Sequence, residues 1–266
     1  MRALIIKKLL LITTLLAFSL NGYSASVVKL TNGEWPPYMS EKYKHYGVMS
    51  HIVSEAFKTQ GIKVEYGFFP WKRAFKEAEA GKEWAGSIGW GKNAEREKTL
   101  LFTNPIIELK DVFFHRKDFQ FDWKTIEDLK KYKIGASTGY SYGKAFDEAD
   151  KNKVIKVHRT AKDVNNLKKV LDNKIDIFPA TMEVGYEIIA NKLPPAAQNM
   201  LTNHPKPLDV RAYHIIISKK TADGPKLVEA FNKGLQMLKD ACKNKSKDIP
   251  CYDTLLSDSL EGKYRP

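Results

Sequence analysis

The sequence contains few of the residues that build metal centres and none of the common motifs of enzyme chemistry. Only two cysteines are present, Cys242 and Cys251, and the six histidines are dispersed with none beside them. This distribution argues against a metal site, because metal ligands recur at short, defined spacings. A nucleophile elbow, a metal-binding helix motif and a Cys/His pair are also missing.

Long apolar runs are equally scarce, and the one that exists lies at the N-terminus. Three basic residues precede the uncharged run Leu9–Leu20, and small residues follow at Gly22 and Ser24. This layout is typical of a secretory signal peptide over residues 1–24. The run is too short to cross a bilayer, which needs about 20 apolar residues. We therefore expect cleavage after Ser24, with Ala25 as the alternative, and a protein in the periplasm.

The expected compartment indicates what the two cysteines do. In an oxidising periplasm, Cys242 and Cys251 are expected to form a disulfide. Closing so short a loop stabilises a fold by about 2–3 kcal/mol on the chain-entropy model. The bond would pin the C-terminal segment.

Acidic residues are outnumbered, and the formal net charge of the chain is +13. The lysines are spread through every segment and do not cluster with aromatic residues, so we expect no nucleic-acid partner. We interpret these scattered lysines as a solvated basic surface. Such a charge also raises the arrival rate of anionic ligands through long-range attraction.

Alternating strand and helix patterns fill the chain and indicate an α/β fold. Met49, Ile52, Val53 and Ala56 recur at helical spacing before Gly61. The first set of expected elements is strand 27–31, helix 47–58, strand 62–66, helix 70–81 and strand 84–89. This β-α-β-α-β order predicts an open α/β sheet.

A second α/β set follows strand 109–115. Capping boxes are expected at Thr125–Asp128 and Thr160–Asp163, each opening a helix. The other elements of this part are strand 133–136, helix 140–150, strand 175–178, strand 212–217 and helix 225–239. The pattern predicts two lobes, with residues 25–115 and 211–266 in lobe 1, residues 116–210 in lobe 2, and two chain crossovers that form a hinge.

Three local motifs follow strand ends in the first lobe. Arg96 precedes Phe102-Thr103-Asn104-Pro105 and follows the segment GSIGWG, while GEWPPY contains Glu34 and Trp35, and PWKRA contains Trp71 and Arg73. From about Val27 to the C-terminus, the chain resembles family 3 of the bacterial extracellular solute-binding proteins. This resemblance implies a two-lobed periplasmic-binding-protein-like fold of type II. It also implies a small-molecule ligand and delivery to the membrane permease of an ABC importer.

The resemblance implies ligand contacts from lobe 1. The arginine at the place of Arg96 grips the ligand carboxylate in this family, because a guanidinium fork binds a carboxylate with two hydrogen bonds. Trp35 and Trp71 match positions where aromatic rings stack on the ligand, and Trp90 lies between two glycines at a strand end. Arg73 is a candidate second cation. The alternatives are a solvated helix surface for the arginines and a buried core for the tryptophans.

Lobe 2 is expected to contribute the turn that contains Tyr140 and Ser141, since its amides and hydroxyls suit an anion. Ser141 occupies the hydroxyl position of the family. Thr181 stands where amino-acid binders of the family carry an aspartate for the ligand α-ammonium. Glu183 or Glu34 could replace that charge, so the expected ligand is any small polar or carboxylate-bearing solute, amino acids included.

Two other classes of function remain open. Some proteins of similar fold are enzymes, such as dehydratases of cyclic carboxylic acids, in which Glu183 or Glu34 would be the proton donor. In a sensory role, the protein would dock on a membrane receptor instead of a permease. The segment Gly89–Ala94 matches a dinucleotide fingerprint, but a proline ends the helix that the motif should open, and we expect no cofactor. We expect a monomer.

Overall fold

The computed structural model describes residues 26–266, so the expected signal peptide lies outside the described residues. The helices and strands are β1 Ser26–Asn32, η1 Lys44–Tyr46, α2 Val48–Lys58, β2 Ile62–Phe68, α3 Trp71–Ala80, β3 Gly86–Gly91, α4 Ala94–Thr99, β4 Leu100–Phe102, β5 Ile107–Arg116, η2 Ile126–Lys131, β6 Ile134–Ser137, α5 Lys144–Lys151, β7 Val157–Thr160, α6 Asp163–Leu171, β8 Phe178–Thr181, α7 Met182–Lys192, α8 Ala197–Met200, β9 Leu201–Asn203, β10 Asp209–Ser218, α9 Gly224–Asn244 and α10 Tyr252–Leu260. Within residues 26–266, none of the helices combines the length and the hydropathy that a membrane span requires.

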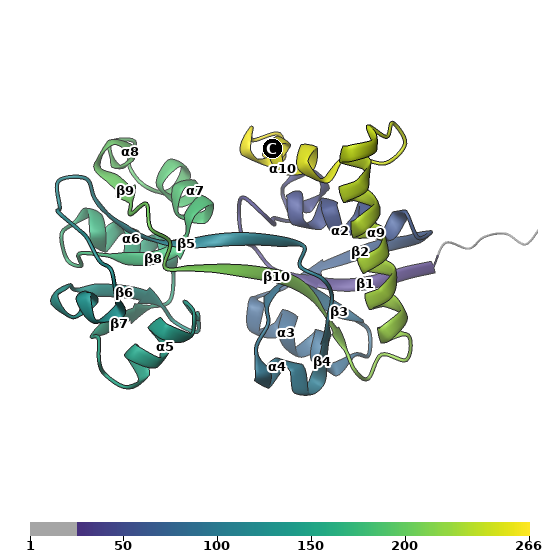
Figure 1. Ribbon diagram of the computed structural model, residues 1–266, viewed down its shortest axis with the longest axis horizontal. Helices are drawn as coiled ribbons and strands as arrows, with labels where there is room; N and C mark the ends of the chain where they lie inside the picture. The colour runs from purple at the N-terminus through teal and green to yellow at the C-terminus, as the bar shows by residue number, and fades with distance from the viewer. Residues whose placement is uncertain (1–25) are drawn as a thin grey trace, which may run out of the picture.

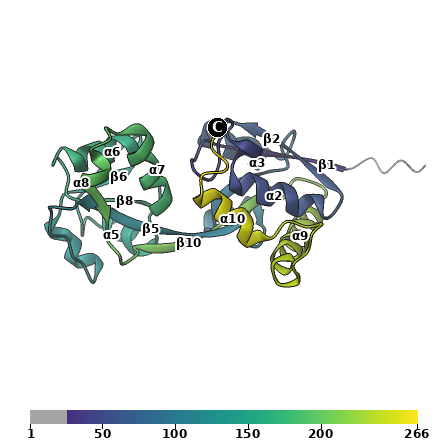
Figure 2. The ribbon, with the colours of Figure 1, turned by 90° about the horizontal axis from the view of Figure 1, so that it is seen from above.

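Two lobes joined by two long strands make up the molecule. Figure 1 shows β5 and β10 running between the lobes, with lobe 2 on the left and lobe 1 on the right, and Figure 2 shows the ribbons of the two lobes at opposite ends of these strands. The predicted two-lobed α/β fold with two crossovers is therefore confirmed.

Lobe 1 is built on a mixed sheet. Strand β1 pairs in parallel with β2 and with β3, and β10 pairs antiparallel with β3 and β4. Helices α2 and α9 pack together over one face, while α3 contacts β1 and β3. The buried side chains of α2 and α9, Phe57 and Phe231 among them, form the main hydrophobic core. Their apolar spacing of three and four residues is what the sequence pattern predicted.

Lobe 2 has a smaller sheet with two hydrophobic clusters. Strands β6 and β7 pair in parallel, while β8 and β9 each pair antiparallel with β5. One cluster lies between β5, β8 and helices α6 and α7, and the other gathers the aromatic rings around Phe113 and Phe146. Each lobe therefore has a hydrophobic core, and Val184 and Ile188 of α7 also pack against the lobe 1 cluster.

Strands β5 and β10 are the hinge. They pair antiparallel, with Asp209 opposite Asp111 and Arg211 opposite Leu109. The lobe boundaries predicted at residues 115 and 210 fall inside these strands, because each strand belongs to both lobes.

The expected disulfide between Cys242 and Cys251 is present and joins the end of α9 to the start of α10. Beyond α10, the chain turns back over lobe 1 and buries Tyr264. The C-terminal segment is thus attached to lobe 1 at both ends, as Figure 2 shows.

Three local predictions for lobe 2 need correction. Thr160 ends strand β7 and does not cap α6, whose first residue is Asp163. The helix expected from Tyr140 begins at Lys144, after Gly143 at a φ of 94°. The strand expected at 175–178 lies at Phe178–Thr181. The sequence analysis did not predict strand β7, because within residues 26–266 this strand pairs with β6 alone and has only one apolar residue, Val157.

Candidate functional site

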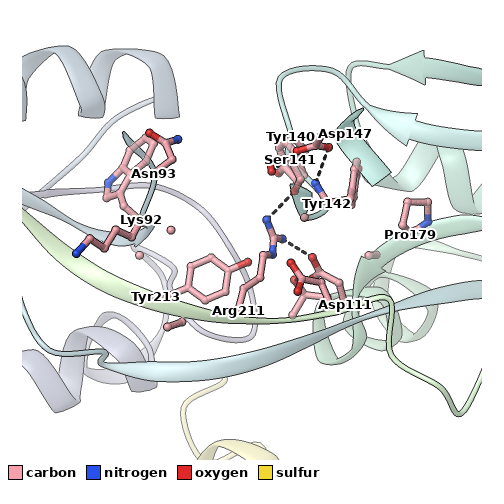
Figure 3. Close-up of a pocket in the computed structure, with 18 of the residues that line it drawn as sticks. Lys92, Asn93, Asp111, Tyr140, Ser141, Tyr142, Asp147, Pro179, Arg211 and Tyr213 are labelled. Carbon is pink, nitrogen blue, oxygen red and sulfur yellow. Dashed lines mark hydrogen bonds and ion pairs between the residues drawn. The ribbon is translucent and has the colours of Figure 1, made fainter. Parts of the chain in front are cut away.

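A cleft of about 800 Å³ lies between the lobes, with its floor on the hinge strands. Figure 3 shows the side chains of β5 and β10 below it and the loop before α5 on the lobe 2 side. Its lining includes seven of the predicted site residues, namely Trp35, Trp71, Trp90, Arg96, Tyr140, Ser141 and Thr181. Residues from both lobes and from the hinge therefore meet at one site.

Three tryptophans form the apolar wall of lobe 1. The Trp71 and Trp90 rings meet edge to face with their centroids 5.4 Å apart, and Trp35 packs against Tyr213 at 4.9 Å. The Trp90 indole N–H donates to the Ser87 hydroxyl at 2.7 Å, which fixes the orientation of the ring. Gly89 has a φ of 83°, a conformation that favours glycine, and marks the irregularity in β3 that precedes Trp90.

Arg96 is the cation of the lobe 1 wall. It lies in α4, where the Asn93 side chain accepts from the Arg96 backbone N–H at 2.9 Å and caps the helix. Its Nη1 donates to the Gly91 carbonyl oxygen at 2.6 Å, and its guanidinium lies 5.0 Å from the centroid of the Trp90 ring. The contacts with Gly91 and Trp90 hold the guanidinium at the wall of the cleft.

The charge of Arg96 has no acidic partner among the ion pairs formed within residues 26–266. Burial, together with the nearby positive charge of Arg211, lowers the pKa of Arg96 from its ordinary value. Both effects disfavour the charged form of Arg96. An anion bound beside Arg96 would therefore relieve an existing electrostatic cost.

The hinge supplies a buried ion pair that our sequence analysis did not identify. Arg211 on β10 forms an ion pair with Asp111 on β5, whose Oδ1 accepts from the Thr181 hydroxyl at 2.8 Å. Asp111 is only 1% exposed. Burial raises the pKa of the Asp111 carboxyl, and the Arg211 charge and the Thr181 hydroxyl oppose that shift. The charges of this pair largely cancel each other on the floor of the cleft.

Arg211 also connects the hinge to lobe 2. Its Nη1 donates to the Ser141 carbonyl oxygen at 2.6 Å, as the dashed lines in Figure 3 show. The Ser141 hydroxyl in turn donates to Asp147 at 2.5 Å, and the same carboxylate accepts from the Tyr142 backbone N–H at 3.0 Å. The loop before α5 is thus held by its own hydrogen bonds. Tyr140, which is 41% exposed, faces the cleft from this loop.

Two predicted site residues do not line the cleft. Glu34 is exposed, and its carboxylate accepts from the Glu41 backbone N–H at 2.8 Å. Arg73 lies on the outer side of α3, where it stacks on Phe69 and pairs with Glu77 at 3.5 Å. Arg73 follows Trp71 by only two positions, so it lies on a different side of the helix from the cleft.

The two proposed catalytic acids also lie elsewhere. Glu183 accepts from the Tyr38 hydroxyl at 2.8 Å and is absent from the cleft lining, as is Glu34. In this structure neither carboxyl borders the space where a leaving group would lie, and a general acid must reach the atom that it protonates. The dehydratase hypothesis therefore loses both of its candidate residues.

Asp111, Arg211 and Tyr213 are among the cleft residues that sequence reasoning missed, as are the acidic residues Asp147, Asp163 and Asp209. The sequence partly indicates the hinge residues among these, because both crossover segments carry charges of opposite sign within otherwise apolar strands. Only the register of β5 against β10 brings these charges together.

A two-lobed ligand-binding protein is the class that this fold and this interlobe cleft define. The chain belongs to family 3 of the bacterial extracellular solute-binding proteins, which it matches over residues 27–245. No curated protein matches the chain.

Solved structures of similar fold include both sensors and transport proteins. A histidine kinase sensor domain with similarity to periplasmic binding proteins has a TM-score of 0.70 and 18% identity, over 89% of this chain and 97% of that chain. An ancestral arginine-binding protein bound to arginine has a TM-score of 0.68 and 19% identity, over 88% and 97%. The substrate-binding protein of an amino acid ABC transporter has a TM-score of 0.65 and 17% identity, over 89% and 100%. The family and these neighbours are binding proteins rather than enzymes.

Proposed function

We propose that this chain is a monomeric periplasmic binding protein that captures a small carboxylate-bearing solute between its lobes for delivery to an ABC importer. The observation that carries this proposal is Arg96, a partly buried cation that forms no ion pair with any acidic residue of the described range 26–266 and faces an aromatic cleft. A carboxylate is the natural ligand of such a guanidinium, because it accepts two parallel hydrogen bonds. Compartment and transporter rest on the expected signal peptide and on the family.

Aromatic surfaces define the rest of the proposed ligand. Trp35, Trp71 and Trp90 offer flat apolar area on lobe 1, and Tyr140 offers it on lobe 2. Rings of this kind bind planar or apolar groups through burial and stacking. We therefore assign a ligand with an anionic end at Arg96 and an apolar or planar body between the rings.

An ammonium group is not required of this ligand. The Thr181 hydroxyl donates to Asp111, and the Asp111 charge is already neutralised by Arg211. Neither residue offers an uncompensated negative charge at the place where the family carries its aspartate. Ser141 and Thr181 are proposed as polar surfaces of the closed cleft, with their hydroxyls already engaged.

A thermal-shift screen of amino acids and organic acids tests the proposal, because a ligand that binds only the folded state raises the melting temperature. The expected result is stabilisation by one class of organic anion, with one molecule bound per chain and the ligand recovered unchanged. Chemical conversion of the ligand would favour an enzyme instead. Stabilisation by purely cationic solutes alone would contradict the role of Arg96.

A sensory role is the second candidate, and the similarity to a histidine kinase sensor domain favours it. Both roles use the same capture step, so the ligand experiment does not separate them. Binding of the loaded protein to a purified permease, compared with its binding to a receptor ectodomain, would do so. The transport proposal predicts tighter binding to the permease when the cleft is occupied.

A further inference from the structure

Helix α7 of lobe 2 contacts lobe 1 on the side of the hinge that faces away from the cleft. Figure 1 shows α7 and the C-terminal end above β5 and β10, whereas α3, α4 and α5, which carry cleft residues, lie below them. Glu183 and Glu187 are one turn apart on α7, and neither of them lines the cleft. The two lobes therefore touch behind the hinge while the cleft in front is open.

Three polar contacts make up this rear interface. The Tyr38 hydroxyl donates to Glu183 Oε2 at 2.8 Å, and the Tyr43 hydroxyl donates to Glu187 Oε1 at 3.0 Å. Arg265 Nη2 donates to Glu187 Oε2 at 2.6 Å, which gives an ion pair. The Glu187 side chain is only 8% exposed, so removing its partners leaves a poorly solvated carboxylate.

Apolar packing accompanies these polar contacts. Val184, which lies between the two glutamates on α7, is buried in the same hydrophobic cluster as Tyr38 and Met49 of lobe 1 and borders the cleft, whereas Glu183 and Glu187 do not. This helix of lobe 2 thus uses one face for contacts with lobe 1.

Arg265 belongs rigidly to lobe 1, because the C-terminal segment is fixed there. The backbone oxygen of Tyr264 accepts from the Lys44 N–H at 2.9 Å, and its hydroxyl lies 2.8 Å from His51 Nδ1. The Cys242–Cys251 disulfide fixes the start of this segment. Residues 246–266 lie beyond the part of the chain that matches the family.

We propose that Tyr38, Tyr43, Glu183, Glu187 and Arg265 form an interlobe latch that stabilises the open form and so lowers ligand affinity. This inference rests on the proposed closure of the lobes. When two bodies rotate about a hinge so that they approach in front, their surfaces behind it separate. Closing over a ligand must therefore break the contacts of Glu187 with Tyr43 and Arg265, and the ligand supplies that free energy.

Unliganded protein is sufficient to test the latch. Both cysteines of the chain are in the disulfide, so a cysteine placed at Lys98 on α4 can carry a single nitroxide label. Closure brings α4 toward α5, and the label then increases the nuclear relaxation of the α5 backbone amides. Arg265→Gln and Glu187→Gln should each raise this relaxation at least about threefold, since each removes a charged hydrogen bond of the open form.

Two further variants make the result decisive. Lys263→Gln removes a cation from the same segment, but among residues 26–266 this lysine forms ion pairs with Asp258 and Glu261 alone, so relaxation should stay at the parent level. Tyr43→Phe deletes one hydroxyl and should give a smaller increase. Parent-level relaxation in a folded Arg265→Gln variant, or an equal increase in Lys263→Gln, would overturn the latch. Because no ligand is added, this outcome is independent of whether the thermal-shift screen finds one.

Discussion

At the scale of single residues, the two guanidiniums of the cleft differ in their partners. Arg211 is neutralised by Asp111, whereas Arg96 is held by a carbonyl oxygen and an aromatic ring. A cation that the protein positions without neutralising is available for an external anion. Sequence motifs could predict Arg96 because the local order of strand, glycines and helix positions it. They could not predict the Asp111–Arg211 pair, which depends on a register between distant segments.

Replacing Arg96 with methionine should weaken binding of the ligand at least tenfold. The substitution keeps an apolar stem beside Trp90 and removes the charged hydrogen bonds, which contribute about 1.5–3 kcal/mol. Titration calorimetry of the parent and the variant measures the difference, and the melting temperature without ligand should hardly change. An unaltered dissociation constant would remove Arg96 from the site.

Replacing Asp111 with asparagine should lower the free energy of unfolding by about 3 kcal/mol, because Arg211 would lose its buried counter-ion. Asp209, directly opposite on β10, provides the matched control. In the described part of the chain its Oδ1 accepts from the Val210 backbone N–H at 3.0 Å, and its charge acts on Arg211 less than that of Asp111, so Asp209→Asn should cost less than about 1 kcal/mol. Urea unfolding of both variants measures these values, and equal losses would argue against a special role of the pair.

At the scale of elements, the C-terminal segment depends on one covalent bond and on a histidine. Cysteine spacing and compartment together predicted the disulfide, because both are properties of the sequence. The packing of Tyr264 against His51 was not predictable, since the contact joins residues 213 positions apart. The same reason explains why β7 was missed, because edge strands depend on their neighbour more than on their own apolar pattern.

Acid should destabilise the protein through His51. Burial, followed by the charge of neighbouring His45, lowers the pKa of His51 to about 4 from its ordinary 6.5, although Glu55 opposes the shift. Between these values the unfolded chain binds a proton that the folded chain does not, so the free energy of unfolding falls as pH falls from 6.5 to about 4. The other groups that face this ring are Lys44, Lys58 and Tyr264.

Urea unfolding at about pH 7 and about pH 4.5 measures this loss. His51→Asn removes the titrating ring, so the difference in the free energy of unfolding between the two pH values should shrink. An equal pH dependence in parent and variant would assign the acid sensitivity to other groups.

Removing the disulfide by Cys242→Ser together with Cys251→Ser should lower the free energy of unfolding by about 2–3 kcal/mol, because the unfolded chain gains freedom. In thermal unfolding, complete reduction of the parent should lower its melting temperature by as much as the two substitutions do. A parent melting temperature that does not respond to complete reduction would contradict this stabilising role.

At the scale of the whole molecule, two lobes are joined by two paired strands and by the packing of α7 against lobe 1. The order of α/β units and the resemblance to a known family predicted this architecture. The rear contacts of α7 with lobe 1 were not predictable, because they join residues far apart in the chain. In the proposed latch, a ligand in the cleft and the contacts behind the hinge act against each other.

Small-angle X-ray scattering of the parent and of Arg96→Met, with and without the solute identified by thermal shift, tests the closure most directly. At a solute concentration that saturates the parent, its radius of gyration should fall as the lobes close, and that of Arg96→Met should not. Stoichiometric binding to the parent without any change in its radius of gyration would contradict closure. Equal compaction of both proteins at that concentration would contradict the role of Arg96.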